Sequence, residues 1–400
     1  MEGKNQIGRW HDISHYEFLK NVAGIEKYPD RALLMDGSFV VVQDGTGLEE
    51  YVTYLRRVGL GPDRVEAVPD VTCLADAQWK KIFNGSGCLQ VFHTTEKAEA
   101  LLARLGKTWR EAAFSPSAEL TENTNCKLTL RAVGTLMGVE EFPPYRVCHS
   151  PEAAIAASRR LTNHVGRVLL KEPRAASGFG MRFVRTAAEI RDFWSQFQPT
   201  TPIIVEQAFL PHTPMSLQWE LWPAGPLVAC ATAQIIDADG LTHLGNVIAA
   251  GNEGLPGVNA ADVQVMEEIS RPYVAYQWSR GYRGVLGFDF LQAESGRVFL
   301  LETNGRVTAT SYAMSVARQV ADRLNRQWAI AMQILTVSRP KFSGFAELCQ
   351  AFGQDLFQGQ EGIVPFLVRL WPKKIGIMIV KRTVPAALGL LEKTRVQLLD

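Results

Sequence analysis

Two apolar segments joined by a short Ser-Gly turn carry the acidic residues that most constrain how this chain can fold. Residues 284–291 and 298–302 have the composition of β-strands. Such a pair forms an antiparallel hairpin, which would place Asp289 and Glu302 side by side. Because residues two apart on a strand share a face, Asn304 is expected to project to the same side as Glu302.

The residues that flank these polar side chains are apolar, so the acids are expected at the edge of a core, where an unpaired carboxylate is costly. Three oxygen ligands from one hairpin suit Mg²⁺, which takes one or two carboxylates and completes its shell with phosphate and water. The simpler alternative is a salt bridge to Arg297 or Arg306. For the three residues together we predict a magnesium site formed by Asp289, Glu302 and Asn304.

A second candidate site follows the predicted strand 165–171, which ends in Lys171. The next residues include Ser177, Gly178 and Gly180, which form a small-residue turn before another strand. Glycines let backbone N–H groups approach an anion closely, and a lysine adds positive charge to the same phosphate. A glycine turn between two strands is also common without any ligand, so this motif alone is a weak indication.

A third segment, residues 203–209, reads as an apolar strand that runs into a short exposed linker. The backbone carbonyl and N–H groups of such a linker can bind the edge of an adenine ring, while apolar neighbours enclose its faces. Most strands of this composition are core and nothing more. The segment therefore gains meaning only beside the other two.

Taken in this order, the three segments resemble the ATP-grasp superfamily, whose members hold ATP between two α+β lobes and join a carboxylate to an amine. The resemblance spans roughly residues 125–306 and is weaker towards the C-terminus. It implies contacts with ATP for Lys127, Lys171, Ser177, Gly178, Gly180, Glu206, Gln207 and Phe209. It implies that Mg²⁺ is bound by Asp289, Glu302 and Asn304.

The resemblance also implies catalytic roles for Lys171 and Arg306. Lys171 would bind the phosphates. Arg306, in the segment Glu-Thr-Asn-Gly-Arg, resembles the arginine that steadies the transferring phosphoryl group or the acyl phosphate.

Two features depart from the superfamily's pattern. Residues 210–216 contain no acid to bind the ribose hydroxyls, and His212 or Gln218 could take that role. Residues 217–260 contain no Lys or Arg, so a third basic residue is missing. That segment offers instead four polar residues in what reads as a glycine-rich loop, facing either substrate or solvent: His243, Asn246, Asn252 and Glu253.

The first third of the chain alternates strand and helix patterns, which predicts a parallel sheet with crossover helices. Strands are expected at 32–35, 39–42, 65–68 and 89–92, with helices at 48–58 and 96–105, and a connection at 115–125. A dinucleotide fingerprint at Gly45 and Gly47 lacks its third glycine, which argues against a dehydrogenase.

Further along, the patterns predict an α+β arrangement with antiparallel hairpins. Helices are expected at 127–137, 151–161, 187–196, 261–280 with a break or kink at Pro272, 317–337 and 385–394. Strands are expected at 181–184, 203–207, in a pair over 217–236, and at an edge over 375–380.

These patterns together predict an α/β and α+β protein. A Rossmann-like domain, of the kind that precedes the ATP-grasp fold in such ligases, is expected in residues 1–122. Residues 123–205 would form the small-lobe region with a central helical segment, and residues 206–400 the large lobe and C-terminal segment.

The charge balance excludes several kinds of partner. The 42 Lys and Arg residues nearly cancel 41 Asp and Glu, which argues against a basic nucleic-acid binder. The six cysteines form no CxxC pair, which fits reduced thiols in a cytosol. No signal peptide is recognised and no apolar run reaches the roughly 20 residues that span a bilayer. We predict a cytoplasmic protein with no nucleic-acid or membrane partner.

The sequence therefore predicts an ATP-dependent ligase that activates a carboxylate as an acyl phosphate and couples it to an amine, releasing ADP and phosphate. Small-molecule carboxylates and amines are its expected partners, including amino acids, and a homodimer is one option. Two alternatives stay open. The acceptor could be a carrier-protein thiol, or the chain could be a nucleotide-binding regulatory or scaffold module without catalysis. Substrate identity depends on loops that the sequence does not define.

Overall fold

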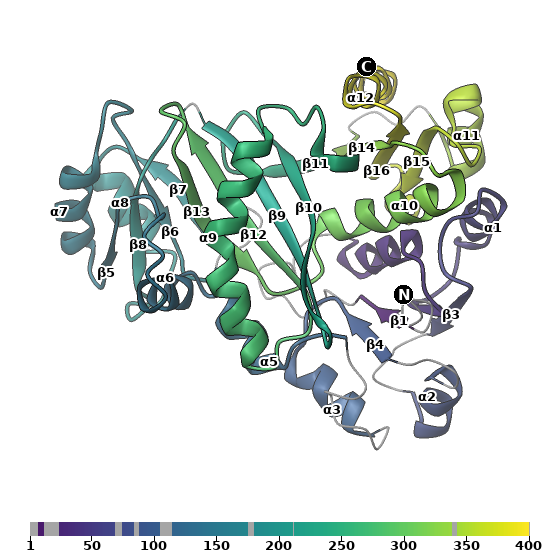
Figure 1. Ribbon diagram of the computed structural model, residues 1–400, viewed down its shortest axis with the longest axis horizontal. Coiled ribbons are helices and arrows are strands. Elements are labelled where there is room, and N and C mark those ends of the chain that lie inside the picture. Colours follow the sequence, from purple (N-terminus) through teal and green to yellow (C-terminus); the bar gives the residue numbers. More distant parts are fainter. Residues whose placement is uncertain are drawn as a thin grey trace.

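Three β-sheets form the framework of the chain in the computed structural model (Figure 1). The structure describes residues 7–11, 24–68, 74–83, 88–104, 114–174, 180–210, 212–337 and 342–399. Within these residues the sheets have four, eight and four strands. Each sheet follows from a different strand pattern in the sequence.

The N-terminal sheet is parallel, as predicted, with strand order β3-β2-β1-β4. Its strands are β1 (Ile7–Trp10), β2 (Phe39–Gln43), β3 (Arg64–Val68) and β4 (Cys88–Val91). The helices between them are η3 (Ile25–Leu34), α1 (Glu49–Arg57) and α2 (Asp76–Phe83), and α3 (Glu96–Arg104) follows β4. Successive residues of β2 enter two separate core clusters, Val40 and Val42 in one, Phe39 and Val41 in the other. Both faces of this sheet are therefore covered, as parallel sheets require.

Two predictions for this region are wrong. Residues 32–35 were predicted as a strand, but the first three of them end the 3₁₀ helix η3 and Met35 follows it. The strand that the prediction missed is β1. A short apolar run that is buried all round has no periodicity to separate helix from strand. Residues 115–125, predicted as a connection, contain helix α5 (Ala118–Asn125), whose N-cap Ser117 accepts a hydrogen bond from the Leu120 N–H.

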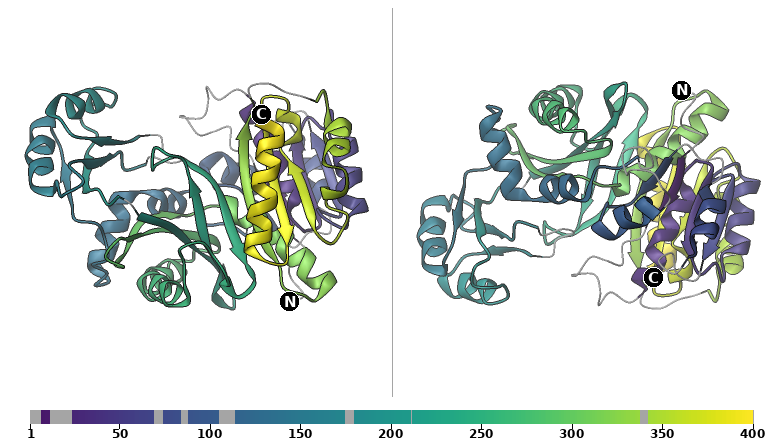
Figure 2. Two further views of the ribbon diagram at one scale, coloured as in Figure 1. Left: turned by 90° about the horizontal axis from the view of Figure 1, so that it is seen from above. Right: turned by 90° about the horizontal axis from the view of Figure 1, so that it is seen from below.

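The small lobe is an antiparallel sheet of order β5-β8-β6-β7. Its elements are β5 (Tyr145–Cys148), α7 (Pro151–Leu161), β6 (Val168–Lys171), β7 (Met181–Val184), α8 (Ala187–Trp194) and β8 (Ile203–Gln207), preceded by α6 (Lys127–Leu136). A separate hydrophobic core joins this sheet to α7 and α8. Seen from above and below, the small lobe stands apart from the rest of the molecule (Figure 2).

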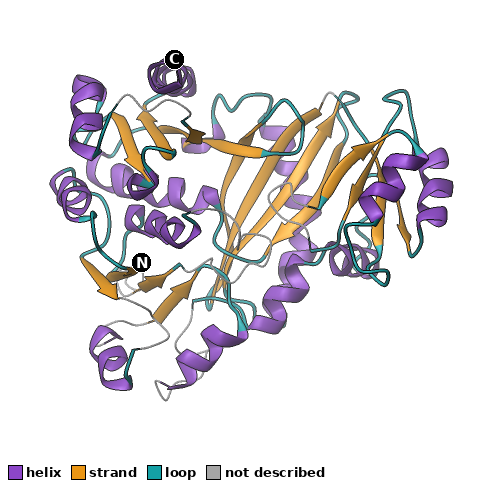
Figure 3. Ribbon diagram, turned by 180° about the vertical axis from the view of Figure 1, so that it is seen from behind, coloured by secondary structure: helices purple, strands orange, loops and turns teal. Residues whose placement is uncertain are grey.

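The third sheet has eight antiparallel strands, in the order β13-β12-β9-β10-β11-β14-β16-β15. Figure 3 shows the strands of the molecule in orange from behind. Its strands are β9 (His212–Trp222), β10 (Gly225–Ile236), β11 (His243–Ala249), β12 (Gly284–Ala293), β13 (Val298–Asn304), β14 (Ala329–Thr336), β15 (Gly362–Phe366) and β16 (Lys374–Lys381). The helical segments of this part are η5 (Ala250–Asn252), α9 (Ala260–Ser279), α10 (Ala309–Leu324), α11 (Phe345–Phe352), η6 (Gly353–Asp355), η7 (Val368–Leu370) and α12 (Val384–Leu399). The pairing of β11 with β14 makes the large lobe and the C-terminal segment one continuous sheet.

Predictions for the C-terminal half need three corrections. Residues 317–337 are not one helix, because α10 ends at Leu324, Asn325 follows in the left-handed region, and β14 begins four residues later. Residues 375–380 are not an edge strand, since β16 lies between β14 and β15. The helix α9 continues through Pro272 without a break.

Gly245 makes the large sheet sensitive to a single methyl group. A Cβ atom there would lie 1.9 Å from the Met332 carbonyl oxygen of the neighbouring strand. We expect Gly245→Ala to lower the free energy of unfolding by about 1–3 kcal/mol, because backbone atoms must move. Gly389, exposed in α12 with nothing within 4 Å of its Cβ position, is the control; Gly389→Ala should raise stability by up to about 1 kcal/mol. Urea unfolding measures both, and equal stability of the two variants would contradict the packing described.

Candidate active site

A cavity of about 520 Å³ lies on one face of the eight-stranded sheet and receives side chains from all parts of the chain. The small lobe contributes Lys171, the 3₁₀ helix η3 contributes Arg31, and β16 contributes Lys374. Alternate residues in the first part of β9 and the last part of β14 line it: His212, Pro214, Ser216 and Gln218, and Met332, Ile334 and Thr336. Since strand side chains alternate between faces, this one face forms the floor of the cavity.

The predicted acidic hairpin is confirmed as a geometric arrangement. Asp289 of β12 lies directly opposite Glu302 of β13, and both line the cavity together with Asn304. The register shifts immediately after Asp289, leaving Leu301 as an extra residue on β13. This bulge lets the consecutive residues Leu301 and Glu302 both face the cavity, which a regular strand does not allow.

Polar neighbours hold the two acids in place. The Asp289 carboxylate accepts hydrogen bonds from the Gln234 side chain at 2.9 Å and from the Asn304 side chain at 2.8 Å. Glu302 forms an ion pair with Lys127, with Nζ 2.8 Å from Oε2. Burial and the adjacent Glu302 charge raise the pKa of Asp289 to about 7. Burial opposes ionisation of Glu302 too, but Lys127 outweighs it and lowers the pKa of Glu302 to about 2.

Lys171 is held by a buried ionic cluster in the small lobe. Its Nζ lies 2.5 Å from Glu206 Oε1, and the other oxygen of Glu206 binds the Arg131 guanidinium. All three side chains are at most 3 % exposed. Burial lowers the pKa of Lys171, and the Glu206 carboxylate opposes that shift. The Arg131 guanidinium also lies over the Phe142 ring, 5.5 Å from its centre.

The end of β8 and the residues after it, 206–210, are called the hinge here, and hydrogen bonds from outside the cavity hold them in place. The Gln207 N–H donates to the Pro144 carbonyl at 2.8 Å, and Asn163 donates to the Ala208 carbonyl at 2.8 Å. His212 Nδ1 lies 2.9 Å from the Phe209 carbonyl oxygen. Glu206, Gln207, Phe209 and His212 all line the cavity, beside an apolar slot formed by Leu169, Met181, Phe183, Leu291 and Leu301.

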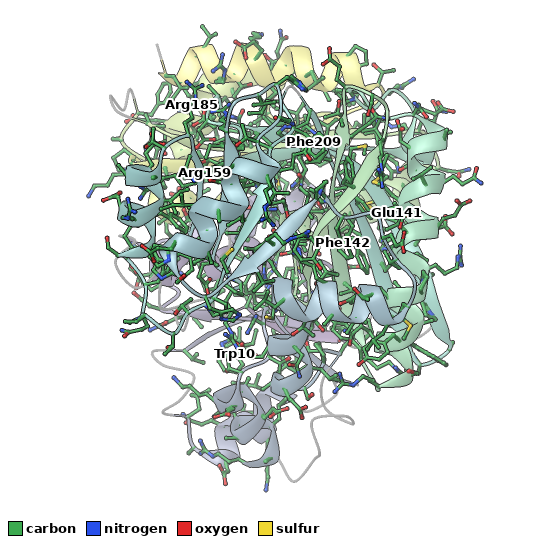
Figure 4. All side chains as sticks on the ribbon, turned by 90° about the vertical axis from the view of Figure 1, so that its left-hand side faces the viewer. Trp10, Glu141, Phe142, Arg159, Arg185 and Phe209 are labelled. Carbon is green, nitrogen blue, oxygen red and sulfur yellow. The ribbon has the colours of Figure 1, made fainter. Side chains whose placement is uncertain are left out.

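Phe209 contributes an aromatic contact to this hinge. Its ring stacks on that of Phe299, with centroids 4.8 Å apart. Phe209 is labelled in Figure 4. Burial lowers the pKa of His212, whose ring contacts the Phe209 carbonyl oxygen. The slot is therefore apolar on its walls and polar along one edge, which suits a flat heterocycle.

Arg306 follows β13 and lines the same cavity. Its guanidinium donates to the Asn304 side-chain oxygen at 2.9 Å and lies 5.7 Å from the centre of the Phe92 ring. The Asn304 amide thus donates to Asp289 and accepts from Arg306. This chain of contacts orients the amide between the acid and the cation.

Four of the residues predicted to bind the nucleotide either do not line the cavity or lie outside the described residues. Ser177 and Gly178 fall outside the described residues. Gly180 has a φ of +69°, its carbonyl accepts from the Glu172 N–H, and it does not line the cavity. Lys127 is buried and meets the cavity only through its ion pair with Glu302.

The predicted glycine-rich loop is largely a strand. His243 and Asn246 belong to β11 and line the cavity, whereas Asn252 and Glu253 do not. The glycines of this segment suggested a loop, but β11 pairs with both β10 and β14. Gly245 lies so close to the Met332 backbone that a Cβ atom would not fit there. Loss of hydration inside the cavity lowers the pKa of His243. The hydrogen bond between His243 and Asn246 opposes this shift, and the positive charges of Arg306 and Arg31 lower the pKa further.

Sequence reasoning missed several cavity or cluster residues, above all Arg131, Arg31, Tyr28 and Lys374. Arg131 had a signal, because it stands one helical turn after Lys127 in a predicted helix. The others carried none, since they come from opposite ends of the chain.

The described residues contain no cluster of three or more His, Cys, Asp or Glu side chains able to hold a metal ion. Two carboxylates and one amide fit a hard cation that keeps water and phosphate among its ligands. Of the helices that are described, none combines the length and the apolar composition needed to cross a membrane.

A parallel N-terminal sheet, a small antiparallel lobe and a large antiparallel sheet that share one cavity define the architecture. The chain has the ATP-grasp fold. It is similar over 98 % of its length to N5-carboxyaminoimidazole ribonucleotide synthetase from Thermus thermophilus, with 16 % identity, a TM-score of 0.61 and 98 % of that chain covered.

Two further solved structures show the same arrangement. Carboxyaminoimidazole ribonucleotide synthase from Aspergillus clavatus, complexed with ATP, matches 100 % of this chain and 99 % of its own, with 13 % identity and a TM-score of 0.60. The biotin carboxylase domain of a 2-oxoglutarate carboxylase from Hydrogenobacter thermophilus, in complex with MgADP and bicarbonate, matches 90 % of this chain and 83 % of its own, with 12 % identity and a TM-score of 0.57. Neither a scan of protein-family models nor a search of curated proteins finds a match.

Glu206 should be indispensable to the small lobe. Glu206→Gln would leave the buried Lys171 and Arg131 charges without their carboxylate, at an expected cost of about 3–5 kcal/mol of unfolding free energy. Glu122→Gln, at an exposed pair with Arg174, is the control and should cost under about 1 kcal/mol. Denaturant titration compares them. A Glu206→Gln protein as stable as the control would show that the cluster is not what holds Lys171.

Proposed function

We propose that the protein is an ATP-dependent ligase that activates a carboxylate as an acyl phosphate and joins it to an amine. The observation that carries this proposal is the shared cavity. It brings Lys171, the Asp289–Glu302 pair and Arg306 to one space beside an apolar slot with a polar hinge. ATP needs an apolar slot for its base, cations for its phosphates, and acids for the divalent cation that accompanies them.

In this proposal ATP is bound along the cavity. The slot formed by Met181, Phe183 and Leu291 encloses adenine, the backbone of Gln207 and Phe209 meets its edge, and His212 lies near the ribose. Lys171 binds the phosphates, and its cluster with Glu206 and Arg131 keeps the ammonium group in place before substrate arrives.

The residues present fit Mg²⁺. Asp289 has its pKa raised by burial and by the adjacent Glu302 carboxylate, so the pair concentrates negative charge that a cation would offset. Asp289 and Glu302 would hold the ion, with Asn304 as the third donor. When bound, Mg²⁺ supplies charge neutralisation on the phosphate oxygens. The ATP and MgADP complexes among the similar structures support both ligands.

The reaction needs positioning and charge more than covalent help from the protein. A carboxylate oxygen of the substrate attacks the γ-phosphorus of ATP, and the bond to ADP breaks. The amine nitrogen then attacks the acyl carbon, phosphate leaves, and the nitrogen loses a proton. Arg306 and Lys171 face the negative charge that develops in these steps, and both are already fixed by neighbours, so little reorganisation is required.

The direct test is ADP release over a panel of carboxylic acids combined with amines and with carrier-protein thiols, with the product mass measured. At least one acid–amine pair should release ADP and give a product lighter by one water than the sum of its parts. Asp289→Asn and Arg306→Met should each lower kcat by about 100-fold. Asp322→Asn, on the exposed side of α10, is the matched control and should behave like the wild-type protein.

Other outcomes separate the alternatives. A thiol that accepts the acyl group where amines do not would assign the carrier-loading reaction. ATP binding without turnover on any pair would favour a regulatory or scaffold module. Wild-type turnover by Asp289→Asn would contradict the role given to the acidic hairpin.

A further inference from the structure

The cavity has a second end, formed by the C-terminal strands and η3, at which the described lining residues include two cations and no acid. In the large sheet, β14 and β16 lie on the far side from β13, which adjoins the small lobe (Figure 1). Arg31 of η3 and Lys374 of β16 line this end. The acids among the described lining residues are Glu206, Asp289 and Glu302, and each is already bound by a cation or an amide.

Arg31 is positioned by aromatic rings rather than by a carboxylate. Its guanidinium carbon lies 5.0 Å from the centre of the Tyr312 ring, 5.4 Å from that of Tyr28 and 5.8 Å from that of Phe92. Its Nε donates to the Tyr28 carbonyl at 3.2 Å. Contacts with ring faces fix the guanidinium plane and leave its terminal N–H groups unused, and no described acid pairs with them.

Lys374 lies close to the same tyrosine. It pairs with Thr336 across β14 and β16, and its Nζ lies 3.3 Å from the Tyr28 hydroxyl. Tyr28 therefore contacts both cations, and within the described ranges Lys374, like Arg31, has no acidic partner.

Neighbouring cations are treated differently. Arg9, at the N-terminal sheet, pairs with Asp36 at 3.1 Å, and Arg369, close to Lys374 in sequence, pairs with the buried Asp30. Arg9 and Arg369 are therefore each paired with a carboxylate. At Arg31 and Lys374 the protein supplies hydroxyl and aromatic groups, which leave room for an anion from outside.

The other walls of this end define the body of the ligand. Ile25, Phe92, Met332 and Ile334 are apolar, and Thr310 and Thr336 add hydroxyl groups. The first turn of α10, with Ala309 and Thr310, also borders the cavity, and a helix N-terminus adds positive potential. An anionic group on a short apolar body complements these walls.

We infer that this end of the cavity binds a non-reacting anionic group of the amine co-substrate. The group is a carboxylate or a phosphate held by Arg31 and Lys374, so that the co-substrate is a small amino acid or a phosphorylated amine, not a neutral amine. The inference rests on the proposed function. Anchoring the anion there turns the amine towards Asp289 and Arg306, where the acyl phosphate would form.

The first experiment uses matched pairs of amines in the ADP-release assay. Small amino acids are compared with their amides, and phosphoethanolamine with ethanolamine, each with the acid panel, ATP and Mg²⁺. The anionic member of a pair should exceed the neutral member by at least about tenfold in kcat/KM, because a hydrogen bond to a charged group is worth about 1.5–3 kcal/mol. Which pair responds distinguishes a carboxylate from a phosphate.

The second experiment removes the cations. Arg31→Gln and Lys374→Gln should each raise the KM for the anionic amine about tenfold and leave the KM for ATP unchanged, and the preference over the neutral amine should shrink. Arg31→Lys, which keeps the charge, should recover part of the loss. Lys373→Gln is the matched control, because Lys373 is the exposed neighbour of Lys374 and lies outside the cavity lining.

The outcomes separate this inference from the function on which it rests. Equal use of neutral and anionic amines, or an unchanged KM in both glutamine variants, overturns the anion site and leaves the ligase intact. A panel in which no acid and amine release ADP overturns both. Calorimetric binding of ATP to the variants verifies that the nucleotide end is still folded.

Discussion

Two buried ion pairs on one short helix hold the parts of the site together. Lys127 and Arg131 stand one turn apart on α6, and both are buried. Arg131 binds Glu206 of the small lobe, while Lys127 binds Glu302 of the large sheet. The helix thereby links both lobes through Glu206 and Glu302, which also line the cavity. Buried ion pairs add little net stability, yet removing one partner is costly, so such pairs define geometry.

The charge of the residues that line the cavity changes from one end to the other. The hinge end is apolar with backbone polar groups, the middle holds the carboxylate pair with Lys171 and Arg306, and the far end presents Arg31 and Lys374 without acids. The chain's 42 basic and 41 acidic residues nearly cancel, but they are not mixed evenly here. The near-zero net charge gives no indication of a polyanion partner on the surface, whereas the cations that line the cavity suit small anions.

The sequence was most informative where a pattern is local. The parallel N-terminal sheet and the register of Asp289 with Glu302 follow from strand periodicity and one turn. The strand predicted at 32–35 was wrong because a segment that is buried throughout has no periodicity to separate helix from strand. The single helix predicted over 317–337 was wrong because it ran past Asn325, the left-handed residue at which α10 ends.

The candidate site was predictable only in part, for a related reason. Lys171 and the hairpin acids carry motifs that can be read in sequence, although their roles remain predictions. Arg31 and Lys374 come from opposite ends of the chain and meet only through Tyr28. No local rule connects them, because they come together only in the folded chain, where η3 packs against β15, the strand next to β16.

The central claim is that one cavity between the lobes binds ATP together with a divalent cation on the acidic hairpin. Calorimetric titration of ATP into the full chain, with Mg²⁺ and again with EDTA, tests it most directly. The account predicts one ATP bound per chain and an affinity at least about tenfold weaker without the cation. ATP binding that is absent, or that is equally tight in EDTA, would contradict it.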